Sequence, residues 1–316
     1  MGKRKIIYDC DPGHDDAIAL LIGLAAENLD IVAITTAAGN QTQDRTYANV
    51  KGLLSLVKRE DIPVGRGFEK PIKRELIIAE HIHGKTGIDG AELPLPTIHD
   101  QKLKALDVMV DVLRKAKEKI TIVATGPLTN VAILLLAYPE LKEKIDSIVF
   151  MGGACFGGNY TPNAEFNIYV DPEAADIVLN SNLPMYMFGL DVTLKGQFFK
   201  EDIEEVRDMK TKTSKVISGL LDFMSHKIAM PFLAPENHIE GIHLHDACAM
   251  AYLVEPSMFK MVPLNVSVNL QEGISLGQTV VDYNKRTKKN ENVEVGFDID
   301  NKKFIELVKE SIKKFD

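Results

Sequence analysis

Cysteine is scarce in this chain, with three among 316 residues. Cys10, Cys155 and Cys248 are far apart, and no two of them have Cys-x-x-Cys spacing. An odd number of widely spaced thiols does not indicate a disulfide framework and is typical of proteins that stay in a reducing compartment. We therefore expect a cytoplasmic protein.

Long apolar runs and an excess of positive charge are also missing. No segment approaches the roughly 20 apolar residues that a membrane-spanning helix needs. Only three apolar residues separate the basic N-terminus Met1–Lys5 from the first acid, which is too few for a signal peptide. The formal net charge of −8 opposes the phosphate contacts that dominate nucleic-acid binding. We expect neither a membrane nor a nucleic acid among the partners.

The remaining composition is that of an ordinary globular protein, with 45% hydrophobic and 26% charged residues. Apolar strands and helical segments alternate through the first two thirds of the chain, which predicts a mostly parallel sheet flanked by helices. We predict a single α/β domain over residues 1–316 with a small additional antiparallel element. Strands of the sheet are expected at 6–8, 31–37, 120–124, 148–151 and 185–190, and antiparallel strands at 266–268, 279–281 and 293–297.

Polar residues follow the predicted parallel strands at the point where each strand ends. In open α/β sheets, ligands bind beyond the carboxyl ends of the strands. The residues that occupy these positions are Asp11, Asn40, Thr125, Met151 and Asp191. We expect them to line one edge of one sheet and to carry the chemistry.

The first of these strand ends carries a run of acids, with four carboxylates within the eight residues from Asp9 to Asp16. So many like charges share a small site cheaply only if a cation lies among them. Asp15 and Asp16 open a helix, where amide donors and the dipole favour negative charge, and Asp11 lies on the preceding turn. Oxygen ligands suit Ca²⁺, which we favour over Mg²⁺. The alternative is simple helix capping by Asp15 with solvated neighbours.

A second acid precedes a later helix, in the sequence His243-Leu244-His245-Asp246. Asp246 is placed either to cap this helix or to supply a further carboxylate to the metal. His245 titrates near neutrality as a free side chain and is a candidate general acid.

Two further segments are rich in polar groups. In the segment from Asn159 to Asn167, an extended backbone places Glu165 and Asn167 on one face, suited to a polyol; the alternative is a surface loop. The segment from His81 to Gly87 is expected to be a loop in which His83 touches a ligand. The two His-x-His pairs, at 81 and 243, leave a zinc site open as alternative chemistry.

Together these segments resemble the inosine-uridine nucleoside hydrolase family, whose mark is an N-terminal Asp-x-Asp-Pro-Gly-x-Asp-Asp run. The resemblance covers nearly the whole chain. It continues through Ala38-Gly39-Asn40, Thr125-Gly126-Pro127, Met151-Gly152-Gly153, Ala164-Glu165-Phe166-Asn167, Asp171-Pro172-Glu173-Ala174-Ala175 and His245-Asp246.

This resemblance implies a Ca²⁺-dependent enzyme that hydrolyses the N-glycosidic bond of ribonucleosides and assembles as a homotetramer or dimer. The implied calcium ligands are Asp11, Asp15, Asp16, Asp246 and the carbonyl of Thr125. The implied ribose contacts are Asn40, Asn159, Glu165 and Asn167, with Asp15 and Asp246 shared between metal and sugar, and Met151 near the sugar. His83 and His245 are implied near the base. Asp11 would deprotonate the attacking water, and His245 would assist the leaving group.

The residues within these motifs resemble those of the pyrimidine-specific ribonucleoside hydrolases, so we expect uridine and cytidine as substrates. The segment 225–241, expected to cover the base, departs from that pattern, and a purine or broad specificity is the alternative. More remote alternatives are a zinc hydrolase, a non-catalytic nucleoside-binding protein and a metal-dependent phosphatase with Asp9 as nucleophile. In such a phosphatase, the residues after the second Asp would differ from the Pro-Gly-His-Asp-Asp of this chain.

Overall fold

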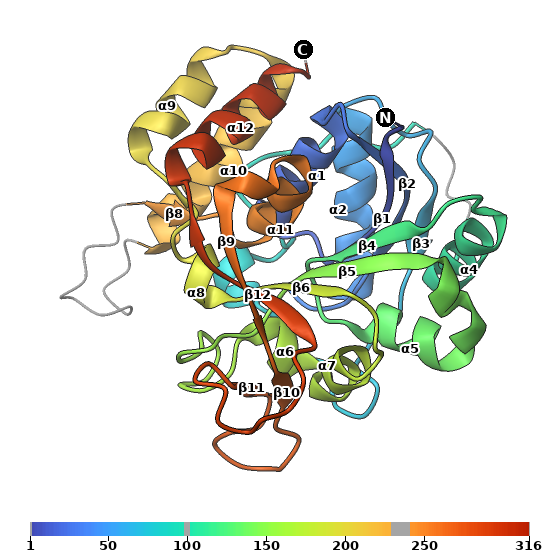
Figure 1. Ribbon diagram of the computed structural model, residues 1–316. Helices are drawn as coiled ribbons and strands as arrows, with labels where there is room; N and C mark the ends of the chain where they lie inside the picture. The colour runs from blue at the N-terminus through green and yellow to red at the C-terminus, as the bar shows by residue number, and fades with distance from the viewer. Residues whose placement is uncertain (1, 98–101, 229–240, 316) are drawn as a thin grey trace.

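The computed structural model describes residues 2–97, 102–228 and 241–315. Its centre is an eight-stranded sheet with the strand order β3-β2-β1-β4-β5-β6-β12-β9 (Figure 1). The strands are β1 (Arg4–Cys10), β2 (Leu29–Thr36), β3 (Val64–Arg66), β4 (Ile120–Ala124), β5 (Ile145–Met151), β6 (Met185–Phe188), β9 (Phe259–Leu264) and β12 (Val293–Ile299). Neighbours run parallel from β3 to β12, and the edge strand β9 runs antiparallel to β12. The predicted mostly parallel sheet is confirmed.

Helices cover both faces of this sheet, as the nearly continuous apolar strands require. On β1, Ile6 and Tyr8 join one core and Ile7 joins the other, because successive side chains of a strand point to opposite faces. The first core is covered by α1 (His14–Ala25), α2 (Gln43–Leu56), α9 (Lys200–Asp208), α10 (Lys212–Ile228), α11 (His245–Val254) and α12 (Asn301–Lys313). The second is covered by α4 (Ala105–Lys115), α5 (Thr129–Ala137) and α7 (Pro172–Leu179).

Short elements complete the described fold. They are α3 (Glu80–His83), α6 (Phe166–Val170), α8 (Leu190–Thr193), the 3-10 helices Pro139–Lys144 and Pro256–Met258, and the paired strands β7 (Gln197–Phe198) with β8 (Ile242–His243) and β10 (Val266–Val268) with β11 (Thr279–Val281). The β10–β11 pair is antiparallel, so the expected small antiparallel element is present.

The prediction for residues 293–297 was wrong in its placement. This segment forms β12, which pairs parallel with β6 and antiparallel with β9 inside the central sheet instead of joining β10 and β11. Local sequence marks the segment as a strand but carries no information about its partners, which are set by long-range packing. Val293 and Val295 are buried in the second core, and this burial decides the pairing.

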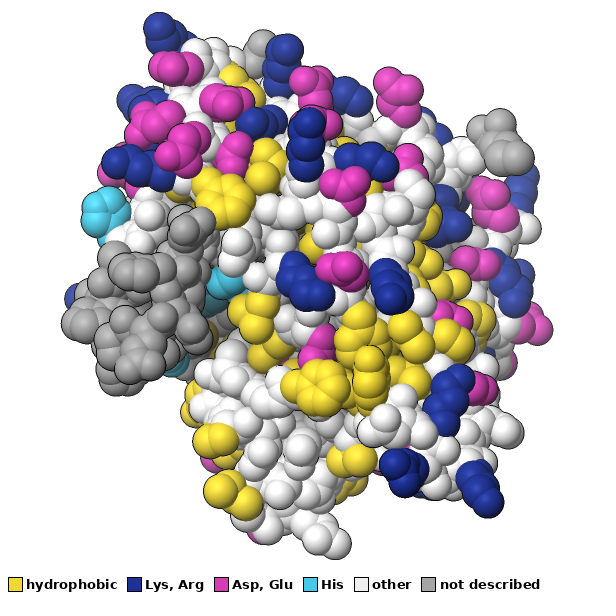
Figure 2. Space-filling view, turned by 60° about the vertical axis from the view of Figure 1, so that its left-hand side comes forward, with side chains coloured by type: hydrophobic (Ala, Val, Ile, Leu, Met, Phe, Trp, Pro, Cys, Tyr) yellow, Lys and Arg dark blue, Asp and Glu magenta, His cyan; other side chains and the backbone are white. Residues whose placement is uncertain are grey.

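On the outer face shown in Figure 2, basic and acidic side chains are interspersed over α9 and α12. Lys309 of α12 pairs with Asp202 and Glu205 of α9, at 3.1 and 2.7 Å. Positive and negative side chains alternate on this face and do not form a patch of one sign. Within the described ranges, no helix has both the length and the apolar character needed to cross a bilayer.

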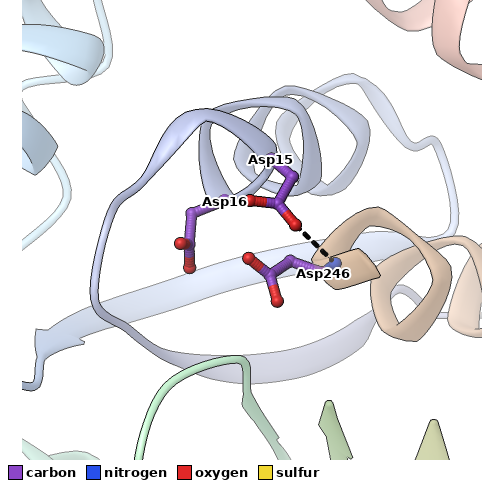
Figure 3. Close-up of side chains that lie close together, drawn as sticks. All are labelled: Asp15, Asp16 and Asp246. Atoms are coloured by element: carbon purple, nitrogen blue, oxygen red, sulfur yellow. Dashed lines mark hydrogen bonds between the residues drawn. The ribbon is translucent and has the colours of Figure 1, made fainter. Parts of the chain in front are cut away.

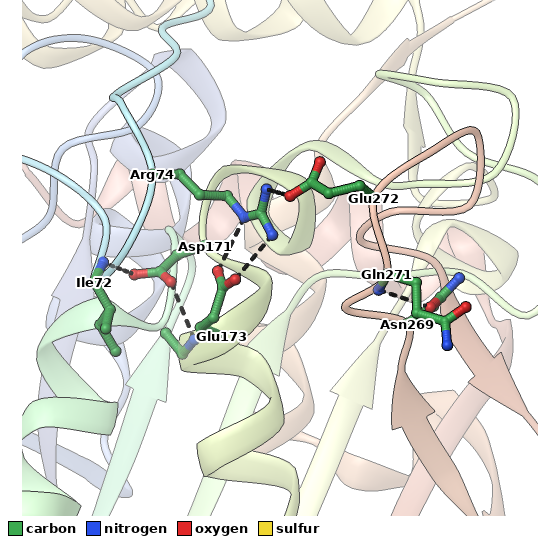
Figure 4. A network of polar contacts seen from close by, with 8 residues as sticks. Ile72, Arg74, Asp171, Glu173, Asn269, Gln271 and Glu272 are labelled. Atoms are coloured by element: carbon green, nitrogen blue, oxygen red, sulfur yellow. Dashed lines mark hydrogen bonds and ion pairs between the residues drawn. The ribbon is translucent and has the colours of Figure 1, made fainter.

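An ion-pair network ties α7 to two distant loops (Figure 4). The guanidinium of Arg74 binds both carboxylate oxygens of Glu173, at 2.8 and 3.0 Å, and also reaches Glu272 at 2.9 Å. Just before Glu173 in the chain, the carboxylate of Asp171 accepts the backbone N–H of Ile72 at 2.9 Å. The network therefore anchors the chain segment that links α6 to α7 and follows the polar motif around Glu165.

Replacing Arg74 by lysine keeps the positive charge but loses the two-pronged contact, so Arg74→Lys is expected to lower the free energy of unfolding by about 1–2 kcal/mol. Urea denaturation followed by circular dichroism measures this change. Lys115→Gln removes an exposed ion pair with Asp111 and is the matched control, expected within about 0.5 kcal/mol of wild type. Equal stabilities of Arg74→Lys and the control would refute the anchoring role.

Candidate functional site

The predicted sheet edge exists. The backbone N–H groups that follow β2 and β4 bond to the end of β1: Ala37 donates to the Cys10 carbonyl at 2.8 Å, and Thr125 donates to the Asp9 carbonyl at 2.9 Å. The turns after three adjacent parallel strands are thereby held side by side. Asp11, Asn40 and Thr125 lie on these turns, and Met151 ends the next strand, β5.

Asp11 is enclosed by the backbone of the two neighbouring turns. Its Oδ2 accepts the N–H of Asn40 at 2.7 Å. A Cβ atom at Gly39 would lie 2.2 Å from this oxygen, and one at Gly126 would lie 2.6 Å from Oδ1. Both motifs therefore require glycine, because any side chain there would displace the carboxylate. Oδ1 is buried and has no hydrogen-bond partner among the described residues.

Three further carboxylates meet beside Asp11. Asp15 and Asp16 come from the first turn of α1, and Asp246 comes from the first turn of α11 (Figure 3). One ligand atom from each lies within 4.8 Å of the others. The backbone N–H of Asp246 donates to Oδ2 of Asp15 at 3.3 Å, and α11 packs against α1 behind the site. The predicted convergence of these aspartates is therefore present.

Burial makes this group of carboxylates electrostatically costly. Burial raises the pKa of Asp11, Asp15 and Asp246 above its ordinary value, and that of Asp16 to about 6. Mutual repulsion adds to the effect: the charge of Asp16 raises the pKa of Asp11, and that of Asp15 raises the pKa of Asp246. Within the described residues no lysine or arginine forms an ion pair with any of the four. Buried charges of one sign need a partner of the other sign, and oxygen donors suit a hard cation.

Thr125 and Asn167 link the acids to the polar segment around Glu165. The hydroxyl of Thr125 donates to Oδ1 of Asp16 at 2.7 Å, and the Thr125 carbonyl accepts the Asn167 amide at 2.8 Å. That carbonyl keeps a second lone pair, so its predicted role as a metal ligand is compatible with this bond. The same amide contacts the carbonyl of Met151 at 3.3 Å.

The backbone after Glu165 has a different conformation from the extended one predicted. The segment is not extended at Asn167: α6 begins at Phe166, and Glu165 is its N-cap. Its carboxylate accepts the N–H of Asn167 at 3.0 Å and that of Gly153 at 2.9 Å. A carboxylate that bonds the free amides of a first turn favours helix, which overrides the extended pattern. Burial raises the pKa of Glu165 to about 7.

The two amides predicted to contact ribose differ in their surroundings. Asn40 is buried, and its amide lies 3.3 Å from Oδ2 of Asp16, so it belongs to the acidic group. Asn159 is exposed, and its Oδ1 accepts the N–H of Phe166 at 2.9 Å. Its visible task is therefore to fix the start of α6, and its contact with a ligand stays a prediction.

His83 is buried and His245 is half-buried, and both are uncharged near neutral pH. The Nδ1 atom of His245 lies 2.7 Å from the hydroxyl of Thr193. Burial lowers the pKa of His245 to about 4, so it does not titrate near neutrality as expected from its type. His83 lies on the one-turn helix α3 instead of in a loop, and burial lowers its pKa as well. In the described part of the chain, the group of possible metal ligands contains aspartates only, so the His-x-His pairs give no support to zinc.

Two residues of the acidic run behave in ways that the sequence reasoning missed. Asp9 points away from the acids, and its Oδ1 accepts bonds from Thr35 at 2.6 Å and Asn130 at 2.8 Å. The sequence contained a sign of this orientation. Asp9 comes two residues after Ile7 on β1, so the two side chains point to the same face of the strand. Because Thr35 and Asn130 hold its carboxylate on the face of β1 that also carries Ile7, Asp9 is unsuited to the nucleophilic role of the phosphatase alternative.

The sequence reasoning also missed His14, which stands between Asp11 and Asp15 in the acidic run. It lies beside His83, with 3.0 Å between the two Nδ1 atoms. The segment predicted to cover the base, residues 225–241, falls largely outside the described residues.

Known proteins resemble this chain over its full length. The family described as "Inosine-uridine preferring nucleoside hydrolase" matches residues 6–306. The pyrimidine-specific ribonucleoside hydrolase RihA of Photobacterium profundum is 47% identical over 315 residues, which are 99% of this chain and 100% of that protein. RihA of Escherichia coli O8 is 48% identical over 309 residues, 98% of each chain.

Solved structures agree with this relationship. A purine-preferring ribonucleoside hydrolase from Gardnerella vaginalis superimposes with a TM-score of 0.91 at 30% identity, covering 99% of both chains. The plant nucleoside hydrolase PpNRh1 gives a TM-score of 0.90 at 32% identity, covering 98% of this chain and 99% of that one. With the buried aspartates at the sheet edge, these similarities show that the chain belongs to the inosine-uridine nucleoside hydrolase family and is a hydrolase of N-glycosyl bonds.

Proposed function

We propose that this enzyme hydrolyses the N-glycosidic bond of pyrimidine ribonucleosides, uridine and cytidine, to give ribose and the free base. The observation that carries the proposal is the buried, uncompensated group of aspartates at the carboxyl edge of the sheet, with amide side chains beside it. The pyrimidine preference is supported by the names of relatives that are 47–48% identical to this chain.

Calcium is the proposed cofactor. Asp11, Asp15, Asp16, Asp246 and the carbonyl of Thr125 would hold it, and the donor set fits because it consists of buried oxygens with raised pKa values. The unpartnered Oδ1 of Asp11 also fits, since a buried carboxylate oxygen without a partner is rare. When bound, the ion would supply positive charge that orients the ribose hydroxyls and increases the acidity of a water molecule.

Asp11 is the proposed general base. Asn40 donates to Oδ2 of its carboxylate, so the two lone pairs of Oδ1 stay available for the proposed calcium and for the proton of the water that attacks C1′. The surrounding glycines keep the carboxylate in one orientation, so little reorganisation is needed when the proton moves.

The proposed ribose contacts are Asn40, Asn159, Glu165 and Asn167. Asn40 contacts Asp16, while Asn159 and Glu165 bond the backbone at the start of α6. Asn167 of α6 contacts Met151. As the glycosidic bond breaks, C1′ gains positive charge, and the carboxylate of Glu165 and nearby carbonyl oxygens stabilise it.

His245 is the proposed group on the leaving base, with His83 as a second contact. Because burial lowers the pKa of His245 to about 4, the ring is neutral at pH 7. It then acts through a hydrogen bond donated from Nε2, provided that Nδ1 accepts the hydroxyl of Thr193. Such a bond stabilises the negative charge that develops on the departing pyrimidine.

One of the similar structures bears on the base specificity. The Gardnerella vaginalis enzyme is named purine-preferring and shares the fold with a TM-score of 0.91, so the fold alone does not select the base. A purine or broad specificity is therefore the second candidate. Assembly as a tetramer or dimer and a cytoplasmic location stay predictions from the resemblance and the cysteine content.

A substrate panel tests the proposed reaction. Purified enzyme incubated with uridine, cytidine, inosine or adenosine is expected to release ribose fastest from the two pyrimidine nucleosides, and a calcium chelator is expected to abolish release. A reducing-sugar assay measures the product. Faster release from inosine would replace the pyrimidine preference by the second candidate, and binding without release from any nucleoside would indicate a non-catalytic protein.

Leaving-group dependence separates Asp11 from His245. Asp11→Asn is expected to reduce kcat by at least about a hundredfold on both uridine and p-nitrophenyl riboside, because both reactions need the base. His245→Ala is expected to lose about a hundredfold on uridine and little on p-nitrophenyl riboside, whose leaving group needs no assistance. Equal losses of His245→Ala on the two substrates would remove its role, and an active Asp11→Asn would remove the base.

Calcium binding is expected to appear in thermal unfolding. At about 100 times Kd, calcium should raise the Tm of wild type by on the order of 5 °C. A carboxylate with a raised pKa stabilises the metal-free fold at low pH and loses that contribution as the pH rises through the raised value, about 6 for Asp16. The gain from calcium should therefore increase as the pH rises through that value.

Two variants sharpen this measurement. Asp246→Asn removes one repelling charge, so it is expected to raise the Tm in chelator and to reduce the gain from calcium. Asp171→Asn changes a buried aspartate outside the acidic group and is the matched control, with a lower Tm and an unchanged gain. A full calcium response in Asp246→Asn would contradict the proposed ligand set.

A further inference from the structure

A chain of hydrogen bonds runs from a loop carbonyl through two histidines to the margin of the acidic group. The Nε2 atom of His14 lies 2.7 Å from the backbone carbonyl of Asp89, and the Nδ1 atoms of His14 and His83 lie 3.0 Å apart. Both rings are buried, with 1% of His14 and 8% of His83 exposed. The sequence pattern did not predict that these two rings contact each other.

The order of donors in this chain follows from one fixed acceptor. A carbonyl oxygen only accepts, so Nε2 of His14 must carry a proton. The buried His14 ring has hydrogen bonds only to a carbonyl and to a second imidazole, and no carboxylate of a described residue bonds either of its nitrogens. A charged ring would be costly there, so His14 is neutral and its Nδ1 has a lone pair. The hydrogen bond between the rings then requires a proton on Nδ1 of His83. Since His83 is neutral too, its Nε2 is a lone-pair acceptor.

The surroundings hold both rings in place. The ring of Phe223 stacks on His14 with 5.0 Å between centroids and 5° between planes. The carboxylate of Asp89 accepts the backbone N–H groups of Lys85 and Thr86, at 3.0 Å each, which fixes the loop that presents its carbonyl. A Cβ atom at Gly13 would lie 2.6 Å from the His83 ring. Neither ring is therefore free to turn over and exchange its nitrogens.

His83 lies beside the acidic group. A Cβ atom at Gly13 would lie 2.6 Å from the His83 ring and 2.9 Å from the amide nitrogen of Asn40, and that amide contacts Asp16. Nδ1 of His83 is used by His14, and Nε2 has no hydrogen bond to any described residue. Nε2 is thus the nitrogen of His83 that remains for a ligand.

We propose that His14 is a positioning residue that fixes His83 as a hydrogen-bond acceptor for an N–H group of the nucleobase. This inference rests on the proposed function, which places the base near His83. Uracil offers N3–H and cytosine offers its exocyclic amino group, and each matches a lone pair. The two histidines at the base then have opposite roles, with His245 donating and His83 accepting.

Nuclear magnetic resonance of ¹⁵N-labelled histidine tests the tautomer without substrate. In wild type, Nδ1 of His83 is expected to have the shift of a protonated nitrogen and Nε2 that of an unprotonated one. His14→Phe keeps an aromatic ring against Phe223 but removes both hydrogen bonds, so His83 should shift toward the Nε2–H form. Lys115→Gln, at an exposed position on α4, is the control and should leave the His83 signals unchanged.

Kinetics tests the contact with the base. Wild type should have a KM for 3-methyluridine, which lacks N3–H, higher than that for uridine by roughly threefold to tenfold, the effect of one hydrogen bond. In His14→Phe this ratio should fall toward one through a rise in the KM for uridine. The kcat for p-nitrophenyl riboside, which has no base, should change little.

The possible outcomes are separable. An Nε2–H tautomer of His83 in wild type, or an unchanged KM ratio in His14→Phe, would overturn the positioning role. If His14→Phe does not fold, His14→Asn retains an acceptor for Nδ1–H of His83 and should preserve both the tautomer and the KM ratio; loss of either would count against the proposal. Failure of wild type to release ribose from uridine would overturn the proposed function, and with it the base contact, whereas the tautomer is decided independently by the spectra.

Discussion

The structure depends on one electrostatic constraint, the burial of like charges at the carboxyl edge of a parallel sheet. Asp11, Asp15, Asp16 and Asp246 are almost completely removed from water, and the described residues supply no cationic side chain to pair with them. Backbone amides and the first turns of two helices offset part of the repulsion. The rest of the repulsion is left uncompensated by the described residues, and the proposed calcium would relieve it.

Much of the surrounding architecture keeps these charges in place. The glycines of two turns let the backbone approach Asp11, and the bonds between the ends of β1, β2 and β4 hold the turns together. The carboxylate of Glu165 fixes the start of α6 and the turn after β5 at once. Groups that would otherwise move are thus held before any ligand arrives, which is the arrangement that catalysis by positioning and electrostatics needs.

Neutral histidines complement the charged group. His14 and His83 are buried and His245 is half-buried, and the loss of contact with water lowers the pKa of all three rings. A neutral ring has one donor and one acceptor, and its partner decides which nitrogen is which. The partners that the described residues supply here are Thr193 for His245 and the carbonyl of Asp89 for His14. The same fold in purine-preferring and pyrimidine-specific relatives is consistent with base choice residing in such local contacts.

The amino-acid sequence determined the features that are local in origin: the strand, turn and helix around the acidic run, the parallel sheet and the edge on which the polar turns gather. These follow from short patterns of apolar, turn-forming and capping residues. Tertiary structure decided what those patterns do not contain. Asp246 reaches Asp15 across 231 residues because α11 packs against α1, Asp9 turns away because its strand alternates, and β12 enters the central sheet because its valines are buried there. Burial also set the pKa values, since the same side chain is an acid, a base or a neutral hydrogen-bonding group according to the water and charges that surround it.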